Sequence, residues 1–454
     1  MSKRMGHFLH LDLALALAVA LGVLYVLSGR NSGSSRNGRS STSLHKNSLA
    51  APDLSFRHFR QRDPSVVIAK YKLRKIALAK RDSLCVFGPT QSFKTSRLAI
   101  PIINQFGEGS AVVSSVKTDL FEATSGDRRR YGEVYVFDPF LISGEGNCQF
   151  DPVVLCGDPL QRRRVATLIT SNLAVAGGGT DSKFWATLAS RLLESLLHAA
   201  FIGDMSFLEL MRWVEEGSFD EPRKLLLEGG EGVSLRRLLA LFSEDEKIIS
   251  STVTTLEAYL EPFHMMRFSK GEGLLNLATL DPSHTLMTIY LVAPPTRQVE
   301  AGQLFATLIS AIFDRVYQNS KAIRTLFVFD EAANLAPITN LDEVVSTIAS
   351  FGGQIISIYQ DFAQLSHRYH DGAMSIVNNH RAKLFLGGIS DPSTINLALQ
   401  ISGSNRQVKR YPIKAVKNVE DKSFPNGALR VLAPGVGLLV YGHRPAIVVR
   451  MLAK

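Results

Sequence analysis

A stretch that could bind a nucleoside triphosphate stands at residues 86–96, in the sequence VFGPTQSFKTS. The phosphate-binding pattern G-x-x-x-x-G-K-[ST] is met at Gly88, Lys94 and Thr95, while Phe93 stands where the pattern has its second glycine. In such a loop the backbone N–H groups point at the phosphates, the lysine contacts the β and γ phosphates, and the hydroxyl binds Mg²⁺. We therefore expect ATP and Mg²⁺ as cofactors. The predicted binding loop consists of Gly88, Pro89, Thr90, Gln91, Ser92, Phe93, Lys94, Thr95 and Ser96.

The aromatic residue at position 93 is the main departure from this pattern. A glycine there lets the backbone approach the β-phosphate closely, whereas a Cβ atom can clash with it. If Phe93 has a positive φ, its side chain also costs on the order of 1–2 kcal/mol. Because 1.4 kcal/mol corresponds to a factor of ten, this cost weakens nucleotide binding about tenfold or more without preventing it.

Two further motifs fit the same chemistry. The sequence RTLFVFDEAANL, residues 324–335, is an apolar strand that ends in Asp330 and Glu331, as in a Walker B element. There the aspartate holds Mg²⁺ and the glutamate polarises the attacking water. Gln360, at the end of the apolar run IISIYQ, is placed to sense the γ-phosphate or to orient that water. We predict Thr95 and Asp330 as metal ligands, Asp330 as part of the nucleotide site, and Glu331, Lys94 and Gln360 as catalytic residues.

The elements that must position these motifs form an α/β pattern. From about residue 84, short apolar runs alternate with stretches of helical period, which indicates a largely parallel, doubly wound sheet. The predicted strands are 83–88, 110–116, 133–138, 285–292, 325–332, 354–360 and 383–389, and the helices include 302–318 and 341–352. Residues 435–442 and 446–452 predict a hairpin that extends the sheet at its edge.

One long region breaks the alternation. From about Asp158 to Leu277 the patterns are helical only, which predicts an all-α domain inserted into the α/β domain. Along one of its helices, Phe184, Leu188, Leu192 and Leu196 have helical spacing and are expected in the core. The predicted domains are therefore 63–157, the first part of the nucleotide-binding domain; 158–277, the all-α insert; and 278–454, the second part of the nucleotide-binding domain.

The first 62 residues have a different character. Residues 1–29 contain the apolar run Phe8–Gly29, which is long enough for one bilayer crossing and predicts a transmembrane helix. A cleaved signal peptide shares this pattern, but an exported protein would have no ATP to bind. Residues 30–62 are rich in Ser, Gly, Asn and Arg and predict a flexible linker.

Charge and cysteine content narrow the classes of function. The formal net charge is +10, yet residues 30–81 alone carry 13 Lys or Arg against two acids, so the globular part is not a broadly basic nucleic-acid binder. Basic residues beside a membrane span stay in the cytoplasm and contact anionic lipid, although direct contact with DNA also fits this cluster. The three cysteines form no CxxC pair, which argues against a disulfide framework or a zinc site. We expect a single-pass protein of the cell membrane with its C-terminal ATPase domain in the cytoplasm.

The order of the motifs resembles one protein family. GPTQSFKT, SSVKTDL, VYVFDP, LFVFDEAANLAPI, YQDFAQL and NNHRAKLFLGGISDPST follow one another as in the type IV coupling proteins, the TraG/TraD-like ATPases of conjugation and type IV secretion. The resemblance covers about Ser83 to Arg450. It implies a membrane-anchored, RecA-like P-loop motor, assembled as a homo-oligomeric ring of six. Such a motor passes a relaxase–DNA complex or protein substrates to the components of a type IV secretion channel, and its helical insert takes part in substrate docking.

The resemblance also leaves choices open. An oligomeric motor of this kind needs a positive charge supplied across the subunit interface. Arg381, which precedes a predicted strand, is the first candidate for this catalytic role and Arg297 the second, but each can equally form a structural ion pair. Members of the family often carry two membrane helices, whereas one is predicted here. Two other functions remain: a receptor that binds nucleotide without hydrolysing it, and a DNA pump such as the FtsK-like chromosome translocases of cell division.

Overall fold

The computed structural model describes residues 64–452 except 108, 172–179, 231, 269–274, 319–322, 336, 339 and 403–426. The predicted transmembrane segment 1–29 and the predicted linker 30–62 lie outside the described residues. Within the described part of the chain, no helix is both long enough and apolar enough to cross a membrane.

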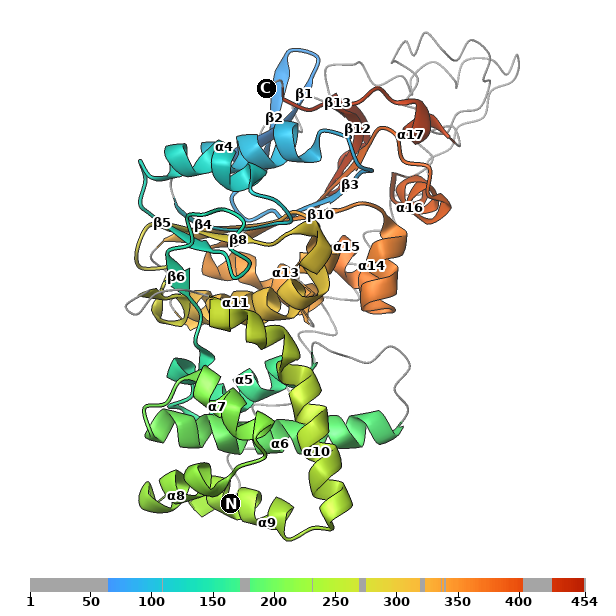
Figure 1. Ribbon diagram of the computed structural model, residues 1–454. Helices are drawn as coiled ribbons and strands as arrows, with labels where there is room; N and C mark the ends of the chain where they lie inside the picture. The colour runs from blue at the N-terminus through green and yellow to red at the C-terminus, as the bar shows by residue number, and fades with distance from the viewer. Residues whose placement is uncertain are drawn as a thin grey trace, which may run out of the picture. The chain divides into compact units, whose positions relative to one another are not determined.

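An eleven-stranded sheet forms the centre of the described chain (Figure 1). Its spatial order is β2-β1-β13-β12-β11-β3-β10-β9-β4-β8-β5. All neighbours from β11 to β5 pair in parallel, which confirms the predicted, mostly parallel sheet. The strands are β1 (Pro64–Tyr71), β2 (Arg74–Ala79), β3 (Leu84–Phe87), β4 (Gly109–Ser115), β5 (Glu133–Phe137), β8 (Met287–Val292), β9 (Arg324–Phe329), β10 (Gly353–Tyr359), β11 (Ala382–Leu386), β12 (Val436–Tyr441) and β13 (Ile447–Arg450).

The other strands of the sheet run antiparallel. β12 and β13 form the predicted hairpin, and β12 pairs with β11. The prediction that this hairpin forms the edge is wrong, because β1 pairs with β13 and β2 pairs with β1. β1 and β2 are not among the predicted strands. Lysines and arginines in these two segments weaken the apolar pattern in the sequence. In the structure, Val66 and Ile68 of β1 and Ile76 and Leu78 of β2 are buried at alternate positions.

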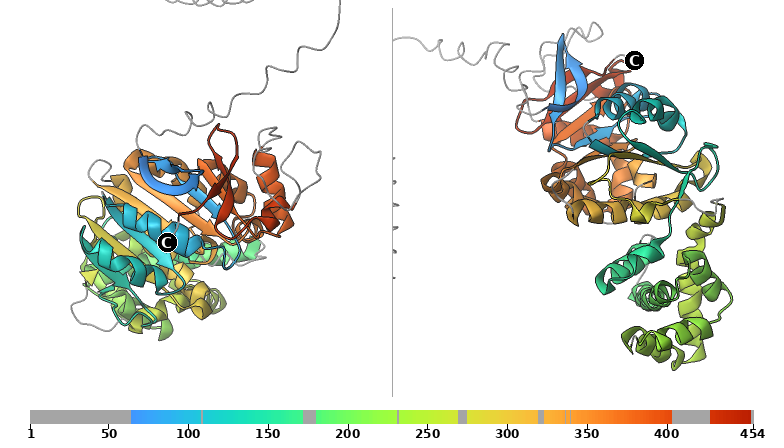
Figure 2. Two further views of the ribbon diagram at one scale, coloured as in Figure 1. Left: turned by 90° about the horizontal axis from the view of Figure 1, so that it is seen from above. Right: turned by 90° about the vertical axis from the view of Figure 1, so that its left-hand side faces the viewer.

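Helices cover both faces of the sheet (Figures 1 and 2). One face carries α3 (Ile100–Gln105) and α4 (Asp119–Arg128), and the other carries α11 (Gln298–Gln318) and α13 (Leu341–Thr347). Along β9, Phe327 and Phe329 belong to the core on the α11 side, while Leu326 and Val328 belong to the core on the α3 side. A strand buried on both faces reads as a continuous apolar run, which is why β9 is recognisable in the sequence.

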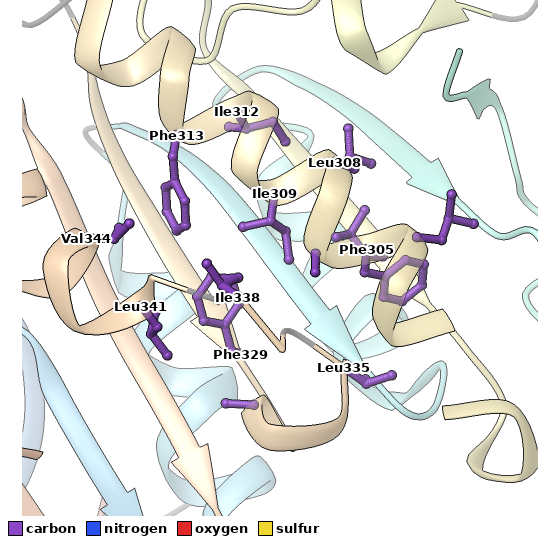
Figure 3. Close-up of a cluster of buried hydrophobic side chains, with 14 of the residues drawn as sticks. Phe305, Leu308, Ile309, Ile312, Phe313, Phe329, Leu335, Ile338, Leu341 and Val344 are labelled. Carbon is purple, nitrogen blue, oxygen red and sulfur yellow. The ribbon is translucent and has the colours of Figure 1, made fainter. Parts of the chain in front are cut away.

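The core beneath β9 fixes the end of that strand in space. Figure 3 shows Ile309 and Phe313 of α11 on the same side as Phe329 and Leu341. The rings of Phe313 and Phe329 are in edge contact, with centroids 6.4 Å apart. Asp330 follows directly after Phe329, so this packing positions the acidic pair at the strand end. The smaller helices on this side are α12 (Ala332–Leu335), α14 (Phe362–Tyr369) and α15 (Gly372–Asn379), with α16 (Pro392–Ser402) and α17 (Ala428–Val431) toward the C-terminus.

Between β5 and β8 the regular structure of the described chain is helical, apart from the two-residue strands β6 (Cys148–Gln149) and β7 (Leu275–Asn276). The helices are α5 (Pro159–Ser171), α6 (Thr180–Ile202), α7 (Phe207–Glu215), α8 (Asp220–Glu228), α9 (Gly232–Phe242) and α10 (Glu246–Leu260). Leu192 and Leu196 are buried as expected, but Phe184 is 53% exposed and lies at the rim of a cavity among α6, α9 and α10. The domain boundaries at 158 and 277 stay a prediction, since one continuous core joins these helices to the sheet.

Candidate nucleotide-binding site

The phosphate-binding motif lies at the C-terminal ends of the parallel strands. β3 ends at Phe87, and residues 88–94 lead into a π-helical turn, Thr95–Ala99, that continues as α3. β3 is fully buried between β10 and β11, so the start of the loop is fixed. Ligands of open α/β sheets bind outside the carboxyl ends of the strands, which is where this loop stands.

The backbone of the loop has the geometry that its glycine pattern predicts. Gly88 has no room for a side chain, because a Cβ there would lie 2.8 Å from Leu386 Cδ1 and from Ser92 Oγ. Phe93 has a φ of 64° and Gln91 a φ of 65°. The condition stated for Phe93 is therefore met, and its side chain costs on the order of 1–2 kcal/mol in this conformation. The loop keeps the left-handed backbone of a glycine without having the glycine.

Lys94, Glu331 and Gln360 meet above the strand ends. Lys94 Nζ donates a hydrogen bond to the Gly88 carbonyl at 3.0 Å and lies 3.3 Å from Glu331 Oε1. Gln360 Nε2 donates to both carboxylate oxygens of Glu331, at 3.3 and 3.2 Å. Glu331 is buried and has a φ of 59°. Strained backbone of this kind persists where the surrounding structure enforces it, and it gathers at functional sites.

Thr95 and Asp330 form the part of the site that suits a metal ion. Thr95 Oγ1 donates to Asp330 Oδ2 at 3.0 Å, while the buried Oδ1 has no hydrogen-bond partner among the described residues. Burial raises the pKa of Asp330 to about 6, and the charge of Glu331 acts in the same direction. Mg²⁺ prefers oxygen ligands, including one or two carboxylates. A buried carboxylate oxygen without a partner, next to a threonine hydroxyl, fits that ion.

The loop after β4 adds polar groups to which the sequence analysis assigns no role. Because β4 and β9 are parallel neighbours, their ends adjoin, and the Asp330 N–H donates to the Ser114 carbonyl at 3.1 Å. Asp119, at the start of α4, is close enough for its charge to raise the pKa of Asp330. The signal for Asp119 is present in SSVKTDL, a polar segment that directly follows a buried strand.

The remaining candidates lie in different places. Arg381 precedes β11, and Ala382 pairs with Leu84 at the start of β3, so Arg381 lies at the opposite strand ends from Lys94. Its Nε is 3.6 Å from Asp82 Oδ1. Arg381 is thus outside the nucleotide site of its own chain, and a role across a subunit interface stays a prediction. Arg297 does follow the C-terminal end of β8, with Nη1 3.4 Å from Glu300 Oε1.

Neither of two cavities in the described structure belongs to this site. One, of about 220 Å³, lies between α5 and α11, and the other, of about 290 Å³, lies among α6, α9 and α10. The chemistry argues for the loop instead, since Lys94, Thr95, Asp330, Glu331 and Gln360 meet there. Ser92 Oγ, inside the loop, is buried and has no hydrogen-bond partner among the described residues.

Two family models match this chain. The model "Type IV secretory system Conjugative DNA transfer" matches residues 45–224, and "TraM recognition site of TraD and TraG" matches residues 324–410. Together they span more than half of the chain and include both the Lys94 loop and the acidic pair. The chain belongs to the type IV coupling proteins.

Curated relatives of this coupling protein agree with the family match. "Protein VirD4" of Rhizobium radiobacter is 24% identical over 333 residues, which is 69% of this chain and 47% of that protein. "Protein VirD4" of Rhizobium rhizogenes is 24% identical over 335 residues, covering 69% and 48%. The coupling protein therefore spans about half the length of the curated relatives it matches.

Solved structures share its fold. The unbound form of TrwBdeltaN70, a bacterial conjugative coupling protein, has a TM-score of 0.68 at 18% identity, over 88% of this chain and 90% of that chain. TrwB in complex with ADP and Mg²⁺ has a TM-score of 0.68 at 16% identity, over 89% and 93%. VirB4 of Thermoanaerobacter pseudethanolicus is more distant, with a TM-score of 0.53 at 13% identity, over 87% and 98%. At these identities the likeness establishes a RecA-like α/β fold for the coupling protein.

Proposed function

We propose that this coupling protein binds ATP with Mg²⁺ and uses ATP hydrolysis to pass relaxase–DNA complexes or protein substrates to a type IV secretion channel. The observation that carries the proposal is the meeting of Lys94, Asp330, Glu331 and Gln360, which come from three separate stretches of sequence, at one set of strand ends. Membership of the family and the ADP–Mg²⁺ complex of TrwB support it.

The binding step exchanges contacts inside the site for contacts with the nucleotide. Lys94 leaves the Gly88 carbonyl and Glu331 and reaches the β and γ phosphates, to which its charge is complementary. The backbone N–H groups of Thr90, Gln91, Phe93 and Lys94 would face the same phosphates, together with the hydroxyl of Ser92, whereas the Gly88 N–H donates to the Tyr359 carbonyl. Thr95 and Asp330 would hold Mg²⁺, whose charge stabilises the negative charge that develops on the phosphates.

The chemical step needs a proton acceptor and a fixed water. Glu331 accepts the proton of the attacking water once Lys94 has turned to the phosphates. Gln360 restrains the Glu331 carboxylate from the neighbouring strand, β10. Preorganised polar groups of this kind stabilise the transition state because they need no rearrangement during the reaction.

The test is ATP turnover and substrate transfer by the full-length protein and its Lys94→Ala variant. Loss of both in the variant is expected, because alanine removes the ammonium group that contacts the β and γ phosphates. Transfer at the wild-type rate by Lys94→Ala would refute the motor. A matched control is Lys75→Ala, whose exposed side chain lies on β2, outside the nucleotide site and outside helices α5–α10.

A receptor that binds nucleotide without hydrolysing it is the alternative that one observation favours. Phe93 places a strained side chain in the loop, which a glycine would relieve. This alternative expects the wild type to bind ATP without turnover and Phe93→Gly to gain turnover. The match to models of conjugative DNA transfer favours both hypotheses over a chromosome translocase.

The proposal extends to location, assembly and docking. The apolar run Phe8–Gly29 and the basic residues after it support a single membrane pass with the ATPase in the cytoplasm, which protease protection of an N-terminal tag tests. A ring of six is proposed from the family resemblance, and native mass spectrometry with ATP measures the number of subunits.

Helices α5–α10 are proposed to dock substrate. Phe184→Glu, at an exposed aromatic of α6, should reduce transfer while leaving ATP turnover unchanged.

A further inference from the structure

Arg97 connects the phosphate-binding loop to a turn from the far end of the sequence. Its guanidinium carbon lies 4.2 Å from the centroid of the Phe93 ring, a distance typical of a cation–π contact. The same guanidinium lies against Gly435, because a Cβ built on that glycine would be 2.6 Å from Arg97 Nη1. One side chain thus touches both the residue that breaks the loop pattern and the segment that enters β12.

The turn that receives Arg97 has a fixed geometry. The Val436 N–H donates to the Ala433 carbonyl at 3.0 Å, and Gly435 has a φ of 81° after Pro434. Proline followed by a glycine of positive φ is the signature of a type II turn. The Met451 N–H, just beyond β13, donates to the Gly435 carbonyl at 2.8 Å. The turn is therefore tied to the sheet, and it offers Arg97 a firm support.

Phe93 is the residue that needs such support. Its φ of 64° is disfavoured for a side chain that has a Cβ atom, so the free loop would tend to turn the peptide before Phe93 over. That rotation would turn an N–H group away from the phosphates. Stacking on Arg97 opposes the rotation, because the ring can remain on the guanidinium only in the observed conformation. The Arg97 N–H also donates to the Phe93 carbonyl at 2.9 Å, which joins the loop to the helix start.

We propose that Arg97 is a positioning residue of the nucleotide site. By stacking on Phe93 and resting on the Gly435 turn, it holds residues 88–94 in the phosphate-binding conformation. A loop with glycine at position 93 would adopt that conformation without such support. Phe93 and Arg97 then act together to fix the conformation of the loop, and that conformation depends on the segment that leads into β12. This inference rests on the proposed nucleotide binding and adds to it the means by which a loop with phenylalanine functions.

The test is a double-mutant cycle in the full-length protein. The dissociation constant of a fluorescent ATP analogue and the kcat and KM for ATP are measured for Arg97→Ala, Phe93→Gly and the double variant. Arg97→Ala is expected to raise Kd and KM about tenfold while kcat changes less than about twofold, because the strain acts on binding. In the Phe93→Gly background the same substitution is expected to change Kd less than about twofold, since a glycine needs no support.

Two further variants sharpen the cycle. Phe93→Tyr keeps the stacking ring and should bind the analogue as the wild type does. Arg97→Lys keeps the charge but not the planar group, so its Kd should fall between those of the wild type and Arg97→Ala. Arg130→Ala is the control, because Arg130 is an arginine with a 78% exposed side chain on the same face of the sheet. An unchanged Kd in Arg97→Ala, or an equal effect of that substitution with and without Phe93, overturns the proposal.

A measurement without nucleotide separates this inference from the proposed function. Amide hydrogen exchange of the peptide spanning residues 88–96 should be faster in Arg97→Ala than in the wild type. It should be no faster in the double variant than in Phe93→Gly. If the wild type does not turn over ATP, the proposed motor function is refuted. The exchange data still test the role of Arg97 in that case. Equal exchange in the wild type and Arg97→Ala contradicts the positioning role, whatever the turnover.

Discussion

At the two ends of its parallel strands, this protein arranges its buried polar groups differently. At the C-terminal ends, Asp330 Oδ1 and Ser92 Oγ are buried without a hydrogen-bond partner among the described residues, and Phe93 and Glu331 have positive φ. At the N-terminal ends, the Gln354 side chain alone makes four hydrogen bonds, to Ser65, Arg324, Ala79 and Asp82.

The N-terminal ends form a hydrogen-bonded network, although the buried Thr325 Oγ1 at the start of β9 has no partner among the described residues. The Tyr441 hydroxyl donates to Asp82 Oδ2 at 2.6 Å, and Arg381 lies beside the same carboxylate. Nearby, the ring of the buried His380 contacts the Ile376 carbonyl at 2.7 Å and Ser357 Oγ at 3.1 Å. The bonds of Gln354 and Tyr441 join the β1–β2 and β12–β13 hairpins to the parallel strands. Their physical role is to complete the sheet.

This difference between the two strand ends predicts which substitutions change activity and which change stability. Unpaired buried groups and strained backbone cost free energy, and they are retained where a ligand supplies the missing partners. Substitutions at the C-terminal ends should therefore change activity and leave the protein as stable as before or more so. Substitutions at the N-terminal ends should change stability and leave the activity of folded molecules intact.

The largest effect is expected for Glu331→Gln. Turnover should fall about 10²–10⁴-fold, because glutamine cannot accept the proton of the attacking water. Binding of the ATP analogue should change only a few fold, since Lys94 and Asp330 remain. Steady-state hydrolysis and equilibrium binding measure the two quantities. Glu300→Gln, at an exposed carboxylate beside Arg297, serves as the control, and normal turnover by Glu331→Gln would remove Glu331 from the chemistry.

Gln354→Leu tests the other strand ends. Loss of four hydrogen bonds leaves several buried groups unpaired and should lower the free energy of unfolding by about 3 kcal/mol. Turnover per folded molecule should stay near that of the wild type. Urea denaturation measures the first and active-site titration the second. Gln105→Leu is the matched control, because the bonds of Gln105 are exposed and should contribute much less. A stable but inactive Gln354→Leu variant would break the comparison.

His380 should make the N-terminal ends sensitive to acid. Burial lowers its pKa from 6.5 to about 4, so the unfolded chain binds the proton more readily between these values. The stability that neutral His380 contributes is complete above pH 6.5 and is lost as the pH falls toward 4, by about 3 kcal/mol. Relative to His380→Gln, the wild type should therefore lose stability over this range in urea denaturation. A constant difference between the two proteins would exclude this linkage.

Asp330 should make the free energy of unfolding depend on pH with the opposite sign to that of His380. The effect should be of similar or slightly smaller size. The pKa of Asp330 is raised to about 6, so the folded protein binds the proton more readily than the unfolded chain, and stability is lost as the pH rises from 3.8 through 6. Asp330→Asn should gain about 3 kcal/mol over the wild type above pH 6 and nothing near pH 4. Turnover should be lost at every pH. A less stable variant at pH 7.5 would show that the carboxylate supports the fold.

The sequence by itself determined the parts of the site whose placement follows from strand periodicity. Buried strands read as apolar runs, and parallel strands bring their carboxyl ends together, so Lys94, Asp330 and Gln360 were bound to meet once the strands were recognised. The same rule applied to Arg381 puts it at the other ends, because it precedes its strand.

Only the tertiary structure decided the features that depend on which distant segments become neighbours. The contact of Arg97 with Gly435 and the bonds of Gln354 join segments that are far apart in the sequence. The pairing of β1 with β13 is of the same kind, since local pattern shows that a strand exists but not which edge it joins. Local propensity acts over a few residues, whereas these contacts are selected by the packing free energy of the whole sheet.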